Sequence, residues 1–263
     1  MTTDTTDVAT LLVLSCDEYA DLWLPFFSVL DRCWPNCPLP IVFVSNEKSL
    51  SHAGVRQIQV GPERSWSDTL LTALTQLTTE YVVLWQEDQF PIDVIDTAEV
   101  MGDIEWLDAR HGNYLHLNPN PRPQKGVDAG HGEVLPGQAY RVSVMPTIWR
   151  TSALKRLLVS GETGWDFENY GSVRSDDMTG FYACTHFTIP LVNGVVKGKW
   201  VPWRVSRLVS LGVALDLDAR QVMGWQDTVR LRLAIARSKV FSLIPWKWRR
   251  RVKGWTLPLR PSK

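Results

Sequence analysis

The chain has 263 residues, an apolar content of 44%, and equal numbers of basic (Lys+Arg, 28) and acidic (Asp+Glu, 28) residues. This length allows one large domain or two small ones with a sizeable core, and a net charge of zero indicates no class of charged partner. No apolar run reaches 18 residues, and residues 1–7 lack the basic and apolar parts of a signal peptide. We therefore expect neither a membrane-spanning segment nor a secretory leader.

Strands and helices alternate through residues 8–85. Short apolar runs predict buried strands, and apolar residues at helical spacing predict the helices between them. Asp17 stands where it could cap the first helix. The order β-α-β-β-α-β predicts a mostly parallel sheet with helices on its faces. Strands are expected at 8–16, 39–45, 55–60 and 81–85, and helices at 18–33 and from Ser65 or Ser67 onward.

Two nucleotide-binding signatures are missing from the sequence. No GxGxxG follows the first strand, which argues against a dinucleotide-binding fold, and no GxxxxGK[ST] occurs, which excludes a P-loop. The segment SCDEY after the first strand is also not the Gly-rich phosphate loop of a nucleotidyltransferase.

The central motif is YVVLWQEDQFP at residues 81–91, in which a buried strand ends in Glu87 and Asp88. Ligands of open α/β sheets bind at the carboxyl ends of the strands. Two acids at such an end suit a divalent cation that carries a phosphorylated ligand. The alternative is a polar strand end with two solvated acids.

The second half of the chain is less regular. Residues 118–137 are rich in Pro and Gly and form a loop longer than a simple connector, which is typical of functional loops. Trp165–Glu168 (WDFE) is expected in a Gly-flanked turn, and Pro190 indicates an edge strand. A helix is expected over 93–110, and strands are expected over 114–117, 140–144 and 187–196. The strand over 140–144 is expected to continue over 147–150, and a helix follows that Thr151 or Ser152 caps and Gly161 ends.

The cysteines indicate no metal site. They form no CxxC pair and no Cys/His cluster of the zinc type, so we expect reduced, mostly buried thiols in a reducing, cytoplasmic compartment. They are Cys16, Cys33, Cys37 and Cys184. Trp occurs 13 times, and Trp is favoured for stacking on sugars and at membrane interfaces.

The C-terminal segment 229–263 carries eleven Lys/Arg residues and no acid, with Trp246, Trp248 and Trp255 around Arg249–Arg251. A basic amphipathic segment with interfacial Trp predicts binding to an anionic membrane surface. One alternative is a helix packed on the domain with a solvated basic face. Nucleic-acid binding is less favoured, because basic and aromatic residues do not gather on the main sheet.

Seven segments, in their order along the chain, resemble those of bacterial GT-A-type glycosyltransferase-like proteins of capsule and lipopolysaccharide biosynthesis. The resemblance covers about residues 10–202 and rests on LLVLSCDEY, PIVFVSNE, RSWSDTLLTAL, YVVLWQEDQF, MPTIWRTSALKRLL, GWDFE and VVKGKW. It implies a nucleotide-sugar donor at the strand ends, with its diphosphate held through Mn²⁺ or Mg²⁺ by a DxD-like motif. Gln89 stands where a further Asp is usual, which leaves room for a donor without a diphosphate, such as a CMP-sugar.

The resemblance also implies roles for individual residues. Glu87 and Asp88 are the metal and donor-phosphate ligands, Glu168 is the base for the acceptor hydroxyl, and Asp166 is the second choice. The alternative for Glu168 is an acid at a helix N-terminus. The implied donor contacts are Ser15, Asp17 and Glu47 around the nucleoside, Trp66 by stacking, and Arg64, Lys197 and Lys199 at phosphate. The two lysines could instead be surface residues, and His186 is either a third metal ligand or structural.

The predicted protein is a cytoplasmic glycosyltransferase on the inner face of the membrane that acts on a surface-glycan or lipid-linked saccharide. Residues 1–212 form the GT-A-like α/β domain, and residues 213–263 form a basic helical extension. The alternative is a non-catalytic scaffold that binds nucleotides or glycans on the same fold. A nucleic-acid partner is not expected.

Overall fold

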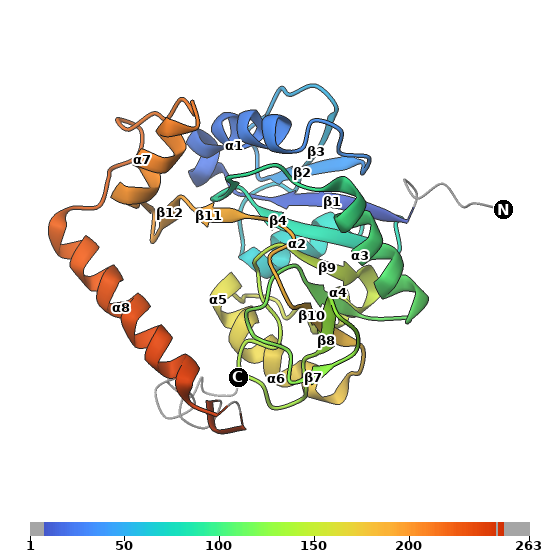
Figure 1. The fold of residues 1–263 in the computed structure, drawn as a ribbon. Helices are drawn as coiled ribbons and strands as arrows, with labels where there is room; N and C mark the ends of the chain where they lie inside the picture. Colours follow the sequence, from blue (N-terminus) through green and yellow to red (C-terminus); the bar gives the residue numbers. More distant parts are fainter. Residues whose placement is uncertain (1–7, 246, 250–263) are drawn as a thin grey trace.

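A nine-stranded sheet forms the centre of the molecule (Figure 1). The structure is a computed structural model and describes residues 8–245 and 247–249. The strand order is β3-β2-β1-β4-β9-β6-β10-β8-β7. The strands are β1 (Ala9–Leu14), β2 (Ile41–Ser45), β3 (Val55–Gln59), β4 (Tyr81–Gln86), β6 (Tyr114–His116), β7 (Lys125–Gly126), β8 (His131–Glu133), β9 (Thr147–Arg150) and β10 (Phe181–Cys184).

The sheet is mixed but mostly parallel. β3, β2, β1 and β4 are parallel to one another, and β10 is parallel to β6. β9 lies between β4 and β6 and is antiparallel to both. Two small sheets sit beside it: β5 (Gln89–Pro91) pairs with β11 (Leu191–Asn193), and β12 (Val195–Val196) pairs with β13 (Lys199–Trp200).

Helices cover both faces of the sheet. β1 is buried along its whole length. Leu11 and Val13 pack toward α1, α3 and α7, whereas Leu12 and Leu14 pack toward α2 and α4. This alternation explains the apolar runs, because each residue of a strand buried on both faces contacts a helix layer. The helices are α1 (Ala20–Cys33), α2 (Trp66–Leu74), α3 (Thr97–Ala109), α4 (Thr151–Leu157), α7 (Pro202–Ser210) and α8 (Trp225–Leu243).

The predicted β-α-β-β-α-β order of residues 8–86 is confirmed, and Ser65 caps α2 by accepting a hydrogen bond from the Asp68 N–H. Two predicted caps are wrong. The Asp17 carboxylate accepts backbone N–H groups of residues 46, 47 and 48, so it fastens the end of β2 instead of capping a helix. Helix α4 already begins at Thr151, and its N-cap residue Arg150 makes no side-chain cap.

Three predictions for the second half are corrected. Residues 140–144 form no strand, because the segment bonds to other elements: the buried Arg141 guanidinium donates to the carbonyls of Val134 and Met178. The WDFE segment is helical and passes from α5 (Gly164–Asp166) into a π-helix, Phe167–Gly171. The strand expected over 187–196 is reduced to β11 and β12. β5, β7, β8 and β10 were not predicted.

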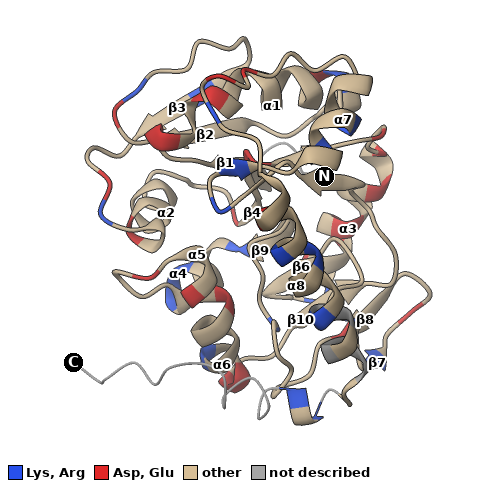
Figure 2. Ribbon diagram, turned by 90° about the vertical axis from the view of Figure 1, so that its left-hand side faces the viewer, with Lys and Arg blue, Asp and Glu red and all other residues tan. Residues whose placement is uncertain are grey.

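The C-terminal helix α8 lies beyond the carboxyl ends of the parallel strands. In Figure 1, α7, β12 and α8 are on the side where β1 ends, and in Figure 2 α8 crosses in front of the sheet. The segment that leads to α8 is fastened to the body, because Arg220 forms a two-pronged ion pair with Asp21 of α1 (both 2.8 Å). No helix within the described ranges is long and apolar enough to cross a membrane.

Candidate active site

The Glu87–Asp88 pair lies at the carboxyl end of β4, in the tight turn before β5. The β1–β4 register places Leu14 opposite Gln86, so the next residues, Ser15 and Glu87, are neighbours across the strand ends. The Ser15 hydroxyl interacts with the Glu87 carboxyl and accepts a hydrogen bond from the Trp23 indole (2.7 Å). Glu87 is buried and Asp88 is half-buried. Glu87 is therefore held inside the sheet edge, whereas Asp88 is partly open to solvent.

Burial opposes the charged form of both acids. It raises the pKa of Asp88 to about 7, and burial together with the nearby Asp88 charge raises the pKa of Glu87 well above its usual range. The same two carboxylates act with burial to raise the pKa of Tyr19 to about 12. Within the described ranges, no Lys, Arg or His makes an ion pair with Glu87 or Asp88.

Two arginines supply positive charge at a longer range. Arg204 of α7 and Arg220 lie close enough to Asp88 to oppose the rise of its pKa. Arg204 donates to the Asn193 carbonyl, and the Arg220 guanidinium lies over the Tyr19 ring (4.4 Å). Both side chains are thus fixed beside the acids by other partners. Two buried carboxylates without direct cations fit a divalent ion, which would remove the penalty that burial imposes on them.

Glu168 is joined to this edge through one residue, Val144. The buried Glu168 carboxylate accepts hydrogen bonds from the Ser143 hydroxyl (2.8 Å) and the Val144 N–H (3.0 Å). The Val144 carbonyl accepts the side-chain amides of Gln86 (3.0 Å) and Gln89 (3.1 Å). The end of β4 and the predicted base therefore bond to the same residue, one through its carbonyl and the other through its N–H.

Buried polar atoms without a partner lie around the same strand ends. They include Gln89 Oε1 and the Thr147 hydroxyl, neither of which has a hydrogen-bond partner among the described residues. His116 and Thr147 are paired residues of β6 and β9. Burial lowers the pKa of His116 to about 4, so its imidazole is neutral at pH 7. Buried polar atoms are normally satisfied, so these atoms are suited to bind water or ligand hydroxyls.

The fold is shared with a solved glycosyltransferase, although no protein-family model and no curated protein matches the sequence. The mannosyltransferase PcManGT from Pyrobaculum calidifontis, in complex with GDP-Man and Mn²⁺, is 18% identical with a TM-score of 0.50, over 78% of this chain and 62% of its own. The chain has a GT-A-like α/β fold. At this identity the similarity shows the fold alone.

Two further structures are less similar. Residues 1–349 of S. aureus TarS are 15% identical, with a TM-score of 0.45 over 68% of this chain and 60% of that one. The galactosyltransferase LgtC, in complex with donor and acceptor sugar analogues, is 12% identical, with a TM-score of 0.41 over 75% of this chain and 77% of that one. The chain spans about 60% of the length of the PcManGT and TarS chains that it matches.

In this GT-A-like fold, several predicted site residues are already bonded within the protein. Asp17 holds the end of β2, and Asp166 makes a capping box with Thr163 at the start of α5. Lys199 forms an ion pair with Asp227 of α8 (2.7 Å). The half-buried Trp66 ring packs against Phe167 (5.3 Å between ring centroids). Exposed side chains are Glu47, Arg64 and Lys197.

The structure brings together Ser15, Glu87 and Asp88, and joins Glu168 to them through Val144. It places His186 elsewhere, because the His186 ring contacts Glu99 of α3. Arg204 and Arg220 were not predicted as site residues. The position of Arg204 was a usable signal, because a cation in the first turn of a helix is disfavoured by the helix dipole and is more readily explained by a role in binding.

Proposed function

We propose that the protein is a glycosyltransferase, which moves a sugar from a nucleotide-sugar donor to a saccharide or glycolipid acceptor. The observation that carries the proposal is the Glu87–Asp88 pair: two acids at the ligand edge of a GT-A-like sheet, buried and without an ion pair among the described residues. Arg204 and Arg220 stand beside the pair and can add positive charge where a leaving phosphate develops negative charge.

Glu87 and Asp88 would hold a divalent ion, Mn²⁺ or Mg²⁺, and such an ion neutralises the departing phosphate when it is bound. Ser15 orients Glu87 from β1. Asp17 and Lys199 would act mainly by fixing the strand ends near the donor, and Glu47, Arg64, Trp66 and Lys197 remain proposed donor contacts.

Glu168 is the proposed base, with Asp166 as the second choice. The hydrogen bonds from Ser143 and Val144 fix the Glu168 carboxylate in one orientation. A carboxylate can then take the proton from an acceptor hydroxyl as the bond to the sugar forms. The unpartnered atoms of Gln89 and Thr147 are suited to bind the remaining sugar hydroxyls.

The test of this assignment is turnover of UDP-, GDP-, dTDP- and CMP-sugars with Mn²⁺ or Mg²⁺, measured as release of the nucleotide in the presence of saccharide acceptors. We expect Glu168→Gln to lower transfer on the order of 10²–10³-fold without changing the melting temperature by more than a few degrees. Glu133→Gln, on β8 and paired with Lys125, is the matched control and should transfer normally. No turnover with any donor would favour the non-catalytic scaffold, and full activity of Glu168→Gln would remove Glu168 from the mechanism.

We also propose that α8 binds an anionic membrane surface, such as the inner face of the cytoplasmic membrane. Trp225, Val229, Leu233 and Val240 are exposed and recur at helical spacing, so they form one apolar stripe along α8. Arg232 lies on one flank of the stripe and Arg230 and Arg237 lie on the other, at 100° per residue. Figure 2 shows basic residues recurring along this helix.

The stripe favours membrane binding over a helix packed on the domain, because its apolar residues are exposed: Leu233 is 65% and Trp225 is 75% exposed. Of the C-terminal segment, Trp246, Arg250, Arg251 and Trp255 lie outside the described residues. Flotation with liposomes that contain anionic lipid should capture the protein, and Leu233→Glu should release it. Glu80→Gln, on the loop before β4, is a control that should float like the wild type, and unchanged flotation of Leu233→Glu would contradict the proposal.

A further inference from the structure

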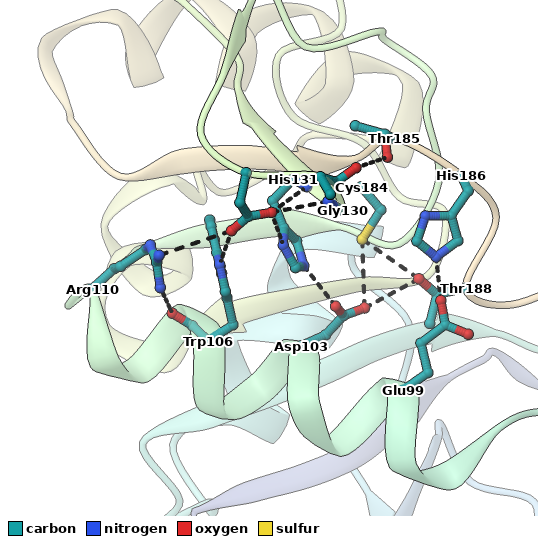
Figure 3. Close-up of polar contacts among 12 residues, drawn as sticks. Glu99, Asp103, Trp106, Arg110, Gly130, His131, Cys184, Thr185, His186 and Thr188 are labelled. Atoms are coloured by element: carbon teal, nitrogen blue, oxygen red, sulfur yellow. Dashed lines mark hydrogen bonds and ion pairs between the residues drawn. The ribbon is translucent and has the colours of Figure 1, made fainter.

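A second cluster of polar side chains lies on the face of the sheet that α1 and α3 cover (Figure 3). It consists of Asp103 from α3, His131 from the start of β8 and Cys184 from the end of β10, and we call it the Asp103 cluster. One ligand atom from each residue lies within 4.8 Å of the other two. Asp103 and Cys184 are buried, and the His131 side chain is only 13% exposed. This site is independent of the proposed transferase function.

The donor atoms of the cluster are the set that zinc prefers: an imidazole nitrogen, a carboxylate oxygen and a sulfur. His131 Nε2 lies 2.8 Å from Asp103 Oδ1, and Cys184 Sγ lies 3.5 Å from Asp103 Oδ2. Ligands of a tetrahedral zinc ion lie about 3.3–3.6 Å apart, given zinc–ligand bonds of about 2.0–2.3 Å. The two distances involve different oxygens of Asp103, so the carboxylate would turn to present one oxygen to the ion together with His131 Nε2 and Cys184 Sγ.

The surroundings of His131 match those of a metal-binding histidine. Its Nδ1 lies 3.0 Å from a carboxylate oxygen of Asp128, and the backbone N–H groups of Gly130 and His131 hold that carboxylate in place. The Trp106 ring stacks on the imidazole (4.0 Å between centroids) and donates to Asp128. A carboxylate at the outer nitrogen orients the ring and directs the other nitrogen at the ion, as in carboxylate–histidine–zinc arrangements.

Carboxylates face both nitrogens of the His131 ring, which a neutral imidazole cannot satisfy. It has one N–H, so one of the two contacts with Asp103 and Asp128 needs either a second proton or a metal ion. The Thr188 hydroxyl completes the cluster, 3.1 Å from Asp103 Oδ2 and 3.5 Å from Cys184 Sγ.

We propose that Asp103, His131 and Cys184 bind one zinc ion. On binding, the Cys184 thiol loses its proton to become a thiolate, and His131 Nε2 gives up any proton it carries, so protons are released as the metal bonds form. A fourth position, beside the Thr188 hydroxyl, is left for water. The ion would fasten α3 to β8 and β10 and so hold the long loop over residues 118–137 in place.

The experiment titrates Co²⁺ into protein that has been stripped with a chelator, and follows the near-ultraviolet absorption that arises from a cobalt–thiolate bond. We expect one equivalent to bind, and one equivalent of Zn²⁺ to abolish the absorption. Cys184→Ser should lose the band, and His131→Asn, which removes a proposed ligand, should abolish binding of the one equivalent. Asp128→Asn, which removes the carboxylate at His131 Nδ1, should weaken binding on the order of 10–100-fold. His186→Asn is the matched control, because His186 contacts Glu99 and lies outside the ligand set.

The outcomes separate the two states of the cluster. The absence of a saturable thiolate band in the wild-type protein would overturn the zinc site and leave an imidazolium that bridges two carboxylates. A band that persists in Cys184→Ser would overturn it as well, by assigning the metal to another of the cysteines. If Cys184→Ser fails to fold, His131→Asn decides the assignment: loss of the band there ties it to the Asp103 cluster, and an unchanged band would overturn the zinc site.

Discussion

The Glu87–Asp88 pair and Asp103 are both buried acids, but the protein treats them differently. Asp103 has a partner on each oxygen, with His131 at one and Thr188 and Cys184 at the other. Glu87 and Asp88 have no ion-pair partner among the described residues, and burial raises the pKa of both. Asp103 has partners within the fold even before a metal ion binds, whereas Glu87 and Asp88 carry an unfavourable charge until a ligand arrives.

The largest expected difference is in activity. Asp88→Asn should lower sugar transfer on the order of 10²–10³-fold, because it removes a charge that would hold the donor phosphate through a cation. Asp103→Asn should leave the turnover of the folded protein within about threefold, since Asp103 lies on α3 and bonds to His131 and Thr188 instead of the strand end that carries Asp88. Initial rates per folded molecule, with Asp93→Asn as an exposed control, test this contrast. Equal losses in both variants would contradict it.

In stability the order should reverse. Asp103→Asn should lower the free energy of unfolding by about 2–4 kcal/mol, because it leaves His131 and its neighbours without a buried charged partner. Urea denaturation in the presence of a chelator would measure this effect without a contribution from bound metal. Asp177→Asn, an exposed acid, should change stability by less than about 0.5 kcal/mol. A loss that small in Asp103→Asn would mean that the Asp103 cluster does not support the fold.

Asp88→Asn should make the protein more stable at pH 8, by about 1–2 kcal/mol, because the amide carries no charge to bury. This combination of lower activity and higher stability is expected of an acid kept for binding. Melting temperatures of wild type and Asp88→Asn at pH 8, without added metal, would measure the gain. A stability loss in Asp88→Asn would contradict the idea that the carboxylate is uncompensated.

The smallest effect is the pH dependence of stability. The pKa of Asp88 is raised to about 7 in the folded protein, from an ordinary value of 3.8. Between these pH values the folded state binds more protons than the unfolded state. The contribution of Asp88 to the free energy of unfolding is therefore fully present below about pH 4 and is lost as the pH rises through 7. The free energy of unfolding of the wild type relative to Asp88→Asn should therefore fall across this window. Parallel curves for the two proteins would show that Asp88 titrates normally.

Sequence patterns predicted the first half of the fold well, for a physical reason. β1, β2 and β4 are buried strands whose apolar residues face helices on two sides, so the pattern is strong and local. The same pattern located Glu87–Asp88, because a buried strand must end where the polar residues begin. The position of Glu168 next to this edge was not predictable from spacing, since it depends on the hydrogen bonds of Val144.

The parts that were missed depend on contacts between distant segments. Strand β8 reads His-Gly-Glu and has no apolar pattern, so only its pairing with β10 and β7 defines it. Residues 140–144 alternate like a strand, but Val142 N–H bonds to the Ser172 hydroxyl instead of a neighbouring strand. The grouping of Cys184, His131 and Asp103 was not predictable from spacing for the same reason, since the three residues meet only in the folded chain.

The central claim is that the Glu87–Asp88 pair binds the donor, and a thermal-shift titration with UDP-, GDP-, dTDP- and CMP-sugars tests it most directly. At a ligand concentration of about 100 times Kd, the folded state gains about 2.7 kcal/mol, which should raise the melting temperature by about 5–10 °C. We predict that one nucleotide class produces this shift, that Mn²⁺ enlarges it, and that Asp88→Asn abolishes it. No shift with any nucleotide-sugar, or an equal shift in Asp88→Asn, would contradict the account.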